Sequence, residues 1–293
     1  MDKSFLSIAL SIKDIKKTEA VLPIARKAAI VTPFLLGDHQ VLKTAILSPQ
    51  NYDREITKTL YKHTTLQNEA GEEIKLKYEE IIAQISNIDR TWLLWACYNS
   101  TYETLGMREI TCDKCGVKSK YKIALNDLVR PDSMFLWDNE IPFYEYVYPI
   151  EITSGEYTYV FETSLPTIQR YNQILNMISI DKIRKNLESN SVLSSSEELS
   201  VLTKSIIIRK GEAELTRTSN LQEILTTLDV AIPTNISEDF KLEYSKRFEK
   251  YSPKFYTYLS CPECKNETKY DVDLESEFFR RVLYGRESTG EEL

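Results

Sequence analysis

The chain is 293 residues long, a length typical of one or two domains. Hydrophobic residues make up 42% of it and charged residues 28%, and it has 18 tyrosines but only 8 glycines. This composition indicates a globular protein with a sizeable core and excludes collagen-like, linker-like and mostly disordered chains. The formal net charge of −7 argues against nucleic acid as the main partner, because proteins that bind phosphate backbones usually carry an excess of positive charge.

Apolar runs in the sequence are too short to span a membrane. The longest, residues 4–12 and 28–37, fall well below the ~20 residues that a bilayer requires, so no stable membrane insertion is expected. The first apolar stretch is followed by no small-residue cleavage site, so no secretory leader is expected either. These patterns predict a protein made in the cytoplasm.

Periodic apolar residues predict helices through the first third of the chain. They are expected from Asp38 to about residue 47, from Asp53 onward, over 75–85 and over 88–102, with a polar loop at 66–74. The helix over 88–102 is the most apolar and carries Trp92 and Trp95 at helical spacing. Such a stripe could line a ligand pocket, but core packing is the more frequent role, and Cys97 on the same helix is also expected to be buried.

Alternating apolar residues predict strands in the remainder of the chain, interrupted by helices. The expected order is a cysteine turn between strands over 109–125, a hairpin over 144–164, a helix over 165–178, a short helix capped by Asp181, a serine-rich connection at 189–200, a strand over 202–209, helices over 220–228 and 237–251, a second cysteine turn and a closing helix. This mixture predicts the α+β class.

Four of the five cysteines form two Cys-x-x-Cys pairs, Cys112 with Cys115 and Cys261 with Cys264. Each such turn directs two thiolates at one ion, and two turns supply the four soft ligands of a tetrahedral zinc site. Because the pairs lie far apart in the sequence, the expected fold is a zinc ribbon with a long insertion between its two hairpins.

The residues around the two cysteine pairs repeat. Residues 110–125 align without gaps on 259–274, with Cys, Cys, Lys, Tyr and Leu identical. After each turn, Tyr, Ile or Val, and Leu recur with a period of two, which puts them on one face of a strand. Tyr102 and Tyr251, each at the end of a predicted helix, match as well. The duplication predicts two equivalent hairpins that face each other across one metal ion, with one zinc per chain.

Other uses of the cysteines have less support in the sequence. Redox-active pairs need a thioredoxin-like βαβ context, which is missing around both turns, and disulfides need an oxidising compartment. An iron–sulfur cluster also uses four thiolates and stays open as an alternative to zinc. A metal closed by four thiolates has no position for water or substrate, so the ion is expected to be structural.

Signatures of catalysis are missing from the sequence. It has no P-loop, no dinucleotide-binding glycine motif, no zinc-protease helix and no nucleophile elbow. The two histidines, His39 and His63, are both expected to be polar surface residues. No nucleophile–base pair can be placed, so the chain is expected not to be an enzyme.

A zinc ribbon that binds nucleic acid or acts in transcription is the alternative function. The lysines around the first cysteine turn could meet phosphates; they are Lys114, Lys118, Lys120 and Lys122. Asp271 and Asp273 lie after the second turn instead, so a solvated strand face is the expected role of these lysines.

One helix and the turn after it resemble a bacteriophage signature. The run Ile88-Asp-Arg-Thr-Trp-Leu-Leu-Trp-Ala-Cys-Tyr, followed by Glu109-Ile-Thr-Cys-Asp-Lys-Cys-Gly, is similar to the helix, strand and cysteine turn of the baseplate hub and hub-assembly proteins of T-even-like contractile-tailed bacteriophages. Leu259-Ser-Cys-Pro-Glu-Cys and Asp273-Leu-Glu-Ser-Glu-Phe-Phe resemble the C-terminal turn and last element of that family. Gly116 matches the family's glycine after the turn, whereas Lys265 departs from it.

The resemblance covers residues 80–125 and 235–283, with a weaker similarity at 31–46. It implies a structural or assembly component of the tail baseplate, in its hub region, without catalysis. The implied partners are other phage tail and baseplate proteins, with no nucleic acid and no stable membrane insertion. The implied location is the host cytoplasm during assembly and the baseplate of the virion tail afterwards.

These patterns predict an α+β fold with helices around a split zinc ribbon, made of two duplicated Cys-x-x-Cys hairpins, and with an additional β-hairpin. The expected regions are a mostly helical N-terminal part (1–86), a helix with the first cysteine turn (87–130), an inserted hairpin and helical part with the serine-rich connection (131–235), a helix with the second turn and a C-terminal helix (236–285), and a loose tail (286–293).

Overall fold

The computed structural model describes residues 16–46, 49–68, 70–128, 143–179, 193–274, 276–278 and 282. Within these ranges the chain combines helices with antiparallel sheets, which confirms the predicted mixture of the two. The expected short helix at Asp181 and the tail at 286–293 lie outside the described residues. No helix in the described ranges is both long enough and apolar enough to cross a membrane.

The first half of the chain forms a four-stranded antiparallel sheet, a set of helices and a separate hairpin. Its elements are β1 (Thr18–Leu22), β2 (Lys27–Val31), α2 (Leu36–Ile46), α3 (Pro49–Lys62), β3 (Thr64–Gln67), β4 (Glu73–Ile74), α4 (Tyr78–Ile82), α5 (Asn87–Thr101), β5 (Thr104–Thr111), β6 (Lys118–Ala124) and the short 3₁₀ helix η1 (Leu125–Asp127). The sheet has the strand order β1-β2-β3-β4, and β5 and β6 form a two-stranded sheet of their own.

The second half builds the same kinds of element. They are η3 (Phe143–Glu145), β7 (Tyr148–Ser154), β8 (Tyr157–Thr163), α6 (Ile168–Met177), α8 (Ser195–Leu202), β9 (Thr203–Lys210), β10 (Ala213–Thr218), α9 (Leu221–Val230), α10 (Thr234–Phe248), η4 (Glu249–Tyr251), β11 (Phe255–Ser260) and β12 (Glu267–Val272). The sheet order is β10-β9-β8-β7, and β11 and β12 form a second two-stranded sheet.

The two halves therefore follow one plan among the described elements. Each has a hairpin, two helices, a second hairpin that completes an antiparallel four-stranded sheet, two more helices and a cysteine hairpin. The duplication predicted around the cysteines thus extends over most of the chain. Residues 131–235, which we expected to be an insertion, contain the counterparts of the sheet and helices of residues 18–82.

Several predicted elements have different bounds in the structure. The N-terminal part, predicted to be mostly helical, also contains the four strands β1 to β4. Strand β2 has the sequence Lys-Ala-Ala-Ile-Val, and Lys and Ala favour helices, so its strand conformation depends on pairing with β1 and β3. The helix expected over 75–85 is limited to α4, and residues 195–200 of the serine-rich stretch belong to α8.

Helix α5 forms the centre of the first core. Trp92, Trp95 and Cys97 are all fully buried, which confirms their predicted place in the core. Phe255 of β11 packs on both tryptophans, with ring centroids 5.1 Å from Trp92 and 6.5 Å from Trp95. The helix that precedes the first cysteine hairpin therefore also supports the second hairpin.

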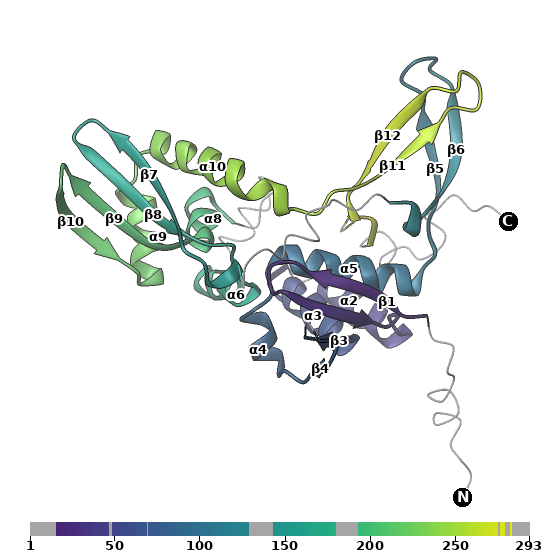
Figure 1. Cartoon of the computed structure of the whole chain (residues 1–293), viewed down its shortest axis with the longest axis horizontal. Helices are drawn as coiled ribbons and strands as arrows, with labels where there is room; N and C mark the ends of the chain where they lie inside the picture. Colours follow the sequence, from purple (N-terminus) through teal and green to yellow (C-terminus); the bar gives the residue numbers. More distant parts are fainter. Residues whose placement is uncertain are drawn as a thin grey trace, which may run out of the picture.

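A second core lies beneath the second sheet. Phe161 of β8 and Phe240 of α10 are fully buried and meet with ring centroids 4.6 Å apart. The buried residues Ile224 of α9 and Ile236 of α10 join the same cluster. Figure 1 shows the two sheets on opposite sides of the molecule and the two cysteine hairpins projecting side by side, away from both sheets.

Candidate metal centre

The two cysteine hairpins have the same strand register. In the first, Thr111 lies opposite Lys118, and in the second, Ser260 lies opposite Glu267. These pairs occupy equivalent positions in the duplicated sequence, immediately outside the six residues of each turn. The predicted equivalence of the two hairpins therefore holds at the level of individual strand pairs.

Backbone hydrogen bonds close the first turn. The amide of Cys112 donates to the carbonyl of Val117 at 2.9 Å, and the amide of Gly116 donates back to the carbonyl of Cys112 at 2.9 Å. Gly116 has a φ of 72°, in the left-handed region that glycine enters without steric cost. This conformation turns the chain back so that both cysteines of the pair point to one side.

The second turn repeats this geometry with different residues. The amide of Cys261 donates to the carbonyl of Asn266 at 2.8 Å, and the amide of Lys265 donates to the carbonyl of Cys261 at 3.0 Å. Lys265 has a φ of 58°, although it carries a side chain. Its departure from glycine therefore leaves the turn unchanged and places a lysine in a strained backbone conformation.

The structure brings the four predicted cysteines together. The sulfurs of Cys112 and Cys264 lie 3.7 Å apart, those of Cys115 and Cys261 lie 3.6 Å apart, and all four lie within 4.8 Å of one another. A disulfide would require about 2.05 Å, whereas a tetrahedron of sulfurs at about 2.3 Å from one ion has edges of about 3.8 Å. The cluster therefore has the dimensions of a site for a single metal ion.

The local electrostatics favour a negative charge on two of the sulfurs. The backbone N–H groups of Cys115 and Lys114 lower the pKa of Cys112 to about 7, and the amides of the second turn lower the pKa of Cys261 in the same way. The amide of Val117 also lowers the pKa of Cys115, but loss of solvent and the three neighbouring sulfurs outweigh it and raise this pKa to about 12. Four clustered thiols thus cannot all ionise without a cation between them.

Apolar residues below the turns hold the hairpins against each other and against the core. Ile123 and Leu125 of the first repeat are buried, as are Val272 and Leu274 at the equivalent positions of the second. These are the side chains for which the period of two predicted one shared face. All four belong to the cluster that surrounds α5. The cysteine turns are therefore positioned by a continuous hydrophobic core.

An ion pair between distant segments adds to this support. Nη2 of Arg108 on β5 lies 2.5 Å from Oε2 of Glu277, in the helical segment that follows β12, and both side chains are largely buried. The contact joins the first hairpin to the end of the second repeat. Neither residue belongs to the duplicated pattern and their spacing carries no periodic signal, so this pair could not be predicted from the sequence.

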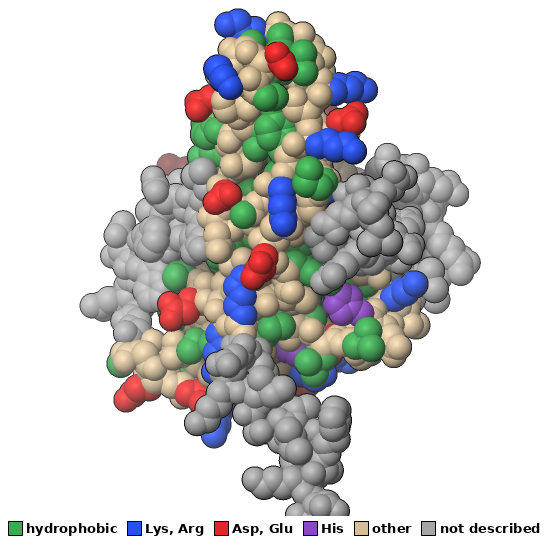
Figure 2. Space-filling model, turned by 90° about the vertical axis from the view of Figure 1, so that its right-hand side faces the viewer, with side chains coloured by type: hydrophobic (Ala, Val, Ile, Leu, Met, Phe, Trp, Pro, Cys, Tyr) green, Lys and Arg blue, Asp and Glu red, His purple; other side chains and the backbone are tan. Residues whose placement is uncertain are grey.

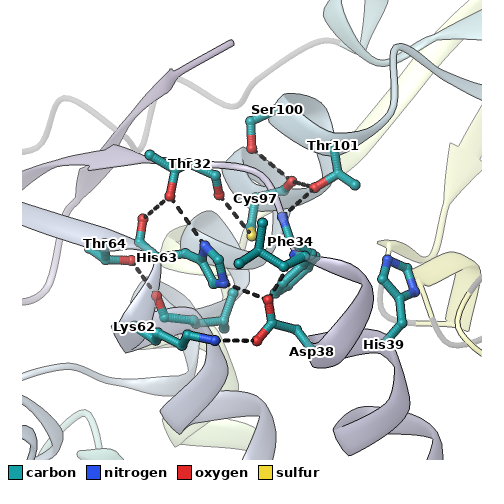
Figure 3. A network of polar contacts seen from close by, with 12 residues as sticks. Thr32, Phe34, Asp38, His39, Lys62, His63, Thr64, Cys97, Ser100 and Thr101 are labelled. Carbon is teal, nitrogen blue, oxygen red and sulfur yellow. Dashed lines mark hydrogen bonds and ion pairs between the residues drawn. The ribbon is translucent and has the colours of Figure 1, made fainter. Parts of the chain in front are cut away.

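A second polar cluster lies in the first half, at the ends of β2, α2 and α3 (Figure 3). His63 is only 7% exposed, so its predicted surface position is wrong. Its Nε2 lies 2.8 Å from Oδ2 of Asp38, and its Nδ1 lies 3.2 Å from the hydroxyl of Thr32. Lys62 and the backbone amide of Leu35 also bind the Asp38 carboxylate, at 2.8 and 2.7 Å.

Asp38, His63 and Thr32 follow one another in the order acid, imidazole and hydroxyl, as in a catalytic relay. Their other hydrogen bonds, however, are those of a structural network. The backbone amide and the hydroxyl of Thr32 both donate hydrogen bonds to the backbone carbonyl of His63. Burial alone would raise the pKa of Asp38, but the hydrogen bonds from Lys62, Leu35 and His63 keep it below its ordinary value. The charged carboxylate thus ties the start of α2 to the end of α3.

Comparisons of the chain with models of protein families, with curated proteins and with solved structures give no match. The cysteine cluster and its supporting residues therefore provide the basis for the function proposed below.

Proposed function

We propose that this chain is a non-catalytic structural or assembly protein in which one zinc ion ties together the two halves. The observation that carries the proposal is the meeting of four sulfurs, two from each cysteine hairpin, at 3.6–3.7 Å between the hairpins. Residues far apart in the sequence reach this point only when both halves are folded. Metal binding would therefore be coupled to the folding of the whole chain.

The choice of zinc rests on the ligand set and its spacing. Four thiolates at a tetrahedral spacing are the usual donors of structural zinc. An iron–sulfur cluster would place several irons and sulfides between the thiolates and would spread the cysteine sulfurs further apart than one ion does. Two separate redox pairs also fit less well, because each turn lies between two strands and neither begins a helix.

The absence of catalysis is inferred from the same ligand set. With Cys112, Cys115, Cys261 and Cys264 all bound, a tetrahedral ion has no open position for water or substrate. A zinc ion in such a site stabilises the fold and lets the exposed surfaces of the two halves serve as binding surfaces for other proteins.

The proposed role in a phage baseplate hub is supported by the resemblance of residues 88–102 and 109–116 to hub and hub-assembly proteins. In this chain those residues form α5, the end of β5 and the first cysteine turn, so the resemblance covers the helix at the centre of the core and half of the metal centre. The proposed partners are other tail and baseplate proteins, and the proposed location is the host cytoplasm followed by the virion baseplate.

Elemental analysis of the purified full chain tests the metal assignment. We expect one zinc per chain and no iron, and removal of zinc by a strong chelator should lower the melting temperature. Two zinc ions per chain, or iron with visible absorbance, would contradict the shared site. Deletion of the gene from its phage tests the assembly role, because heads should still fill with DNA while contractile tails remain incomplete.

Nucleic-acid binding is the second candidate, because Lys118, Lys120 and Lys122 lie on the exposed side of β6. Against it, Lys118 lies 3.7 Å from Glu109, and Lys269 of the second hairpin lies 2.6 Å from Asp271. Figure 2 shows basic and acidic side chains interspersed over the projecting hairpins, with no continuous basic face on this side. Retention on a heparin column at physiological salt would favour this candidate over the first.

A further inference from the structure

A polar groove lies where the two halves of the chain meet. Helix α6 of the second half lies beside α4 of the first (Figure 1), and the amide of Ile168 at the start of α6 donates to the carbonyl of Ile85 at 2.9 Å. Two hollows of about 410 and 490 Å³ adjoin along α6 and share Gln169 and Gln173 in their walls. Together they form one groove, which is distinct from the metal centre.

One end of the groove is lined by two cations. Arg170 binds the carbonyls of Ser200 and Thr203, at 3.0 and 2.5 Å, and Lys204 binds the carbonyl of Tyr144 at 3.2 Å. Among the described residues, neither cation forms an ion pair with a carboxylate. Burial lowers the pKa of both groups, so each has lost part of its hydration while remaining a hydrogen-bond donor. A bound carboxylate would replace that lost hydration.

The single carboxylate that lines this hollow within the described residues is that of Glu145, and its side chain is exposed. At the far end of the groove, Arg54 of α3 adds a positive charge, which is partly balanced by Glu55 at 3.4 Å. The groove thus carries an excess of positive charge in a chain whose net charge is −7. This charge distribution favours an acidic ligand.

The middle of the groove presents amide side chains along one face of α6. Their spacing of three and four residues aligns them in a row, as helical geometry requires; they are Gln169, Asn172, Gln173 and Asn176. The side-chain amides of these four residues form no hydrogen bond with another group in the described part of the chain. Each amide offers a donor and an acceptor, which is the pattern that the N–H and C=O groups of an extended peptide need.

We propose that this groove binds an extended acidic segment of a partner protein, with a carboxylate between Lys204 and Arg170 and the peptide backbone along the amides of α6. The inference names a partner surface for the proposed function and so rests on it. A peptide fits better than a nucleic acid, because a phosphate backbone needs cations along its whole length and the middle of the groove offers neutral amides.

Binding of a fluorescein-labelled hexaglutamate peptide to the metal-loaded full chain, followed by fluorescence anisotropy, tests the inference. Lys204→Gln should weaken binding about tenfold, because it removes a charge-assisted bond. Gln173→Glu should also weaken it, by placing a negative charge in the groove. The matched control is Lys210→Gln at the other end of β9, where Lys210 lies 2.8 Å from Glu156, and its effect should stay within about twofold.

Several results would overturn the inference. The first is that hexaglutamate does not bind at low salt, and the second is that Lys204→Gln and Lys210→Gln weaken binding equally. The third is unchanged binding in Gln173→Glu, and the fourth is tighter binding of an oligothymidylate that depends on Lys204 in the same way. Melting temperatures are measured in parallel, and if Lys204→Gln unfolds the chain, Gln173→Glu decides the outcome. Loss of peptide binding in a chain that still holds one zinc would contradict this inference and leave the proposed function intact.

Discussion

The two cysteine hairpins share their register, their turn hydrogen bonds and their metal-facing sulfurs, yet they differ in the residues that support them. Where β11 has Phe255, packed on two tryptophans of α5, the equivalent position of β5 is Gly106, with a φ of 81° at a break in the strand register. The first hairpin is instead joined to the end of the chain through Arg108 and Glu277. The geometry of the four sulfurs is therefore common to both repeats, whereas each hairpin is held in place by its own contacts.

The helices that lead into the hairpins differ in the same way. Helix α5 is buried along most of its length, and its first turn contains Asp89, which accepts bonds from the amides of Ile24 and Ser86 at 2.9 Å. Helix α10 has the exposed Glu238 at the equivalent position. The first repeat thus contains the helix around which both hairpins pack, whereas α10 packs on the sheet of its own half and, through Phe248, against Ile24 of the first half.

The largest effects are expected from the ligands themselves, and they should be symmetrical. Cys112→Ser and Cys261→Ser should each abolish stoichiometric zinc binding and lower the melting temperature by comparable amounts, of about 10 °C or more, because folding and metal binding are coupled. Cys97→Ser should retain one zinc per chain with a smaller decrease, since Cys97 is not a ligand and its thiol donates a hydrogen bond to the carbonyl of Thr32 instead. Metal analysis with thermal melts measures both, and a Cys97 variant less stable than the two ligand variants would contradict the shared centre.

Phe255→Ala should show how much the second hairpin depends on its packing against α5. Phe255 is 4% exposed, and its removal leaves a cavity against Trp92 and Trp95, which should lower the free energy of unfolding by about 3–4 kcal/mol. Tyr258→Ala on the same strand is the control, because Tyr258 is 58% exposed and its loss should cost about 0.5 kcal/mol or less. Similar values for the two variants in urea denaturation would show that β11 does not depend on α5.

Asp89 should make the stability of the first repeat's leading helix depend on pH, whereas that of the second should depend on it little. Burial raises the pKa of Asp89 to about 6, above its ordinary value of 3.8. The folded chain therefore binds this proton more tightly than the unfolded chain, and the cost of burying the charge, present above pH 6, disappears as the pH falls. Relative to Asp89→Asn, the native protein should gain about 2 kcal/mol between about pH 7 and pH 4.5.

Glu238→Gln is the matched control for this pH dependence, because Glu238 occupies the equivalent position of the repeat, in α10, and is exposed. The difference between the native protein and this variant should change little over the same pH range. Metal loss at low pH affects all three proteins alike and cancels in the comparison. A flat difference for Asp89→Asn would show that the carboxylate stays equally ionised in the folded and unfolded chains.

The smallest expected effect concerns the residues with positive φ in the two turns. Lys265→Gly should raise the free energy of unfolding by about 0.5–1 kcal/mol, because it relieves a left-handed conformation that costs a non-glycine residue about 1–2 kcal/mol. Gly116→Ala should lower it by about 1 kcal/mol from backbone strain alone, since an added Cβ there meets no atom within 4 Å. Denaturant titrations of both zinc-loaded variants measure the effects, and equal signs would break the equivalence of the turns.

Much of the metal centre could be predicted from the sequence because its signals are local. The Cys-x-x-Cys spacing, the alternation of Tyr, Ile or Val, and Leu after each turn, and the gap-free repeat are all visible within sixteen residues of each copy, 110–125 and 259–274. Helix signals are local too, and the apolar periodicity of 88–102 correctly predicts both α5 and its buried tryptophans. Local spacing is enough here because one strand or one helix turn fixes which side chains share a face.

Only the tertiary structure decided how these local pieces combine. Counterpart strands are 130 residues apart at Thr18 and Tyr148 but 149 apart at Lys118 and Glu267, so no gap-free alignment reveals the repeat of the sheets. Strands such as β2 form because neighbours pair with them, and the sequence alone does not specify the partner. The burial of His63 and the pairing of Arg108 with Glu277 likewise follow from contacts between segments far apart in the chain, which leave no pattern in either segment.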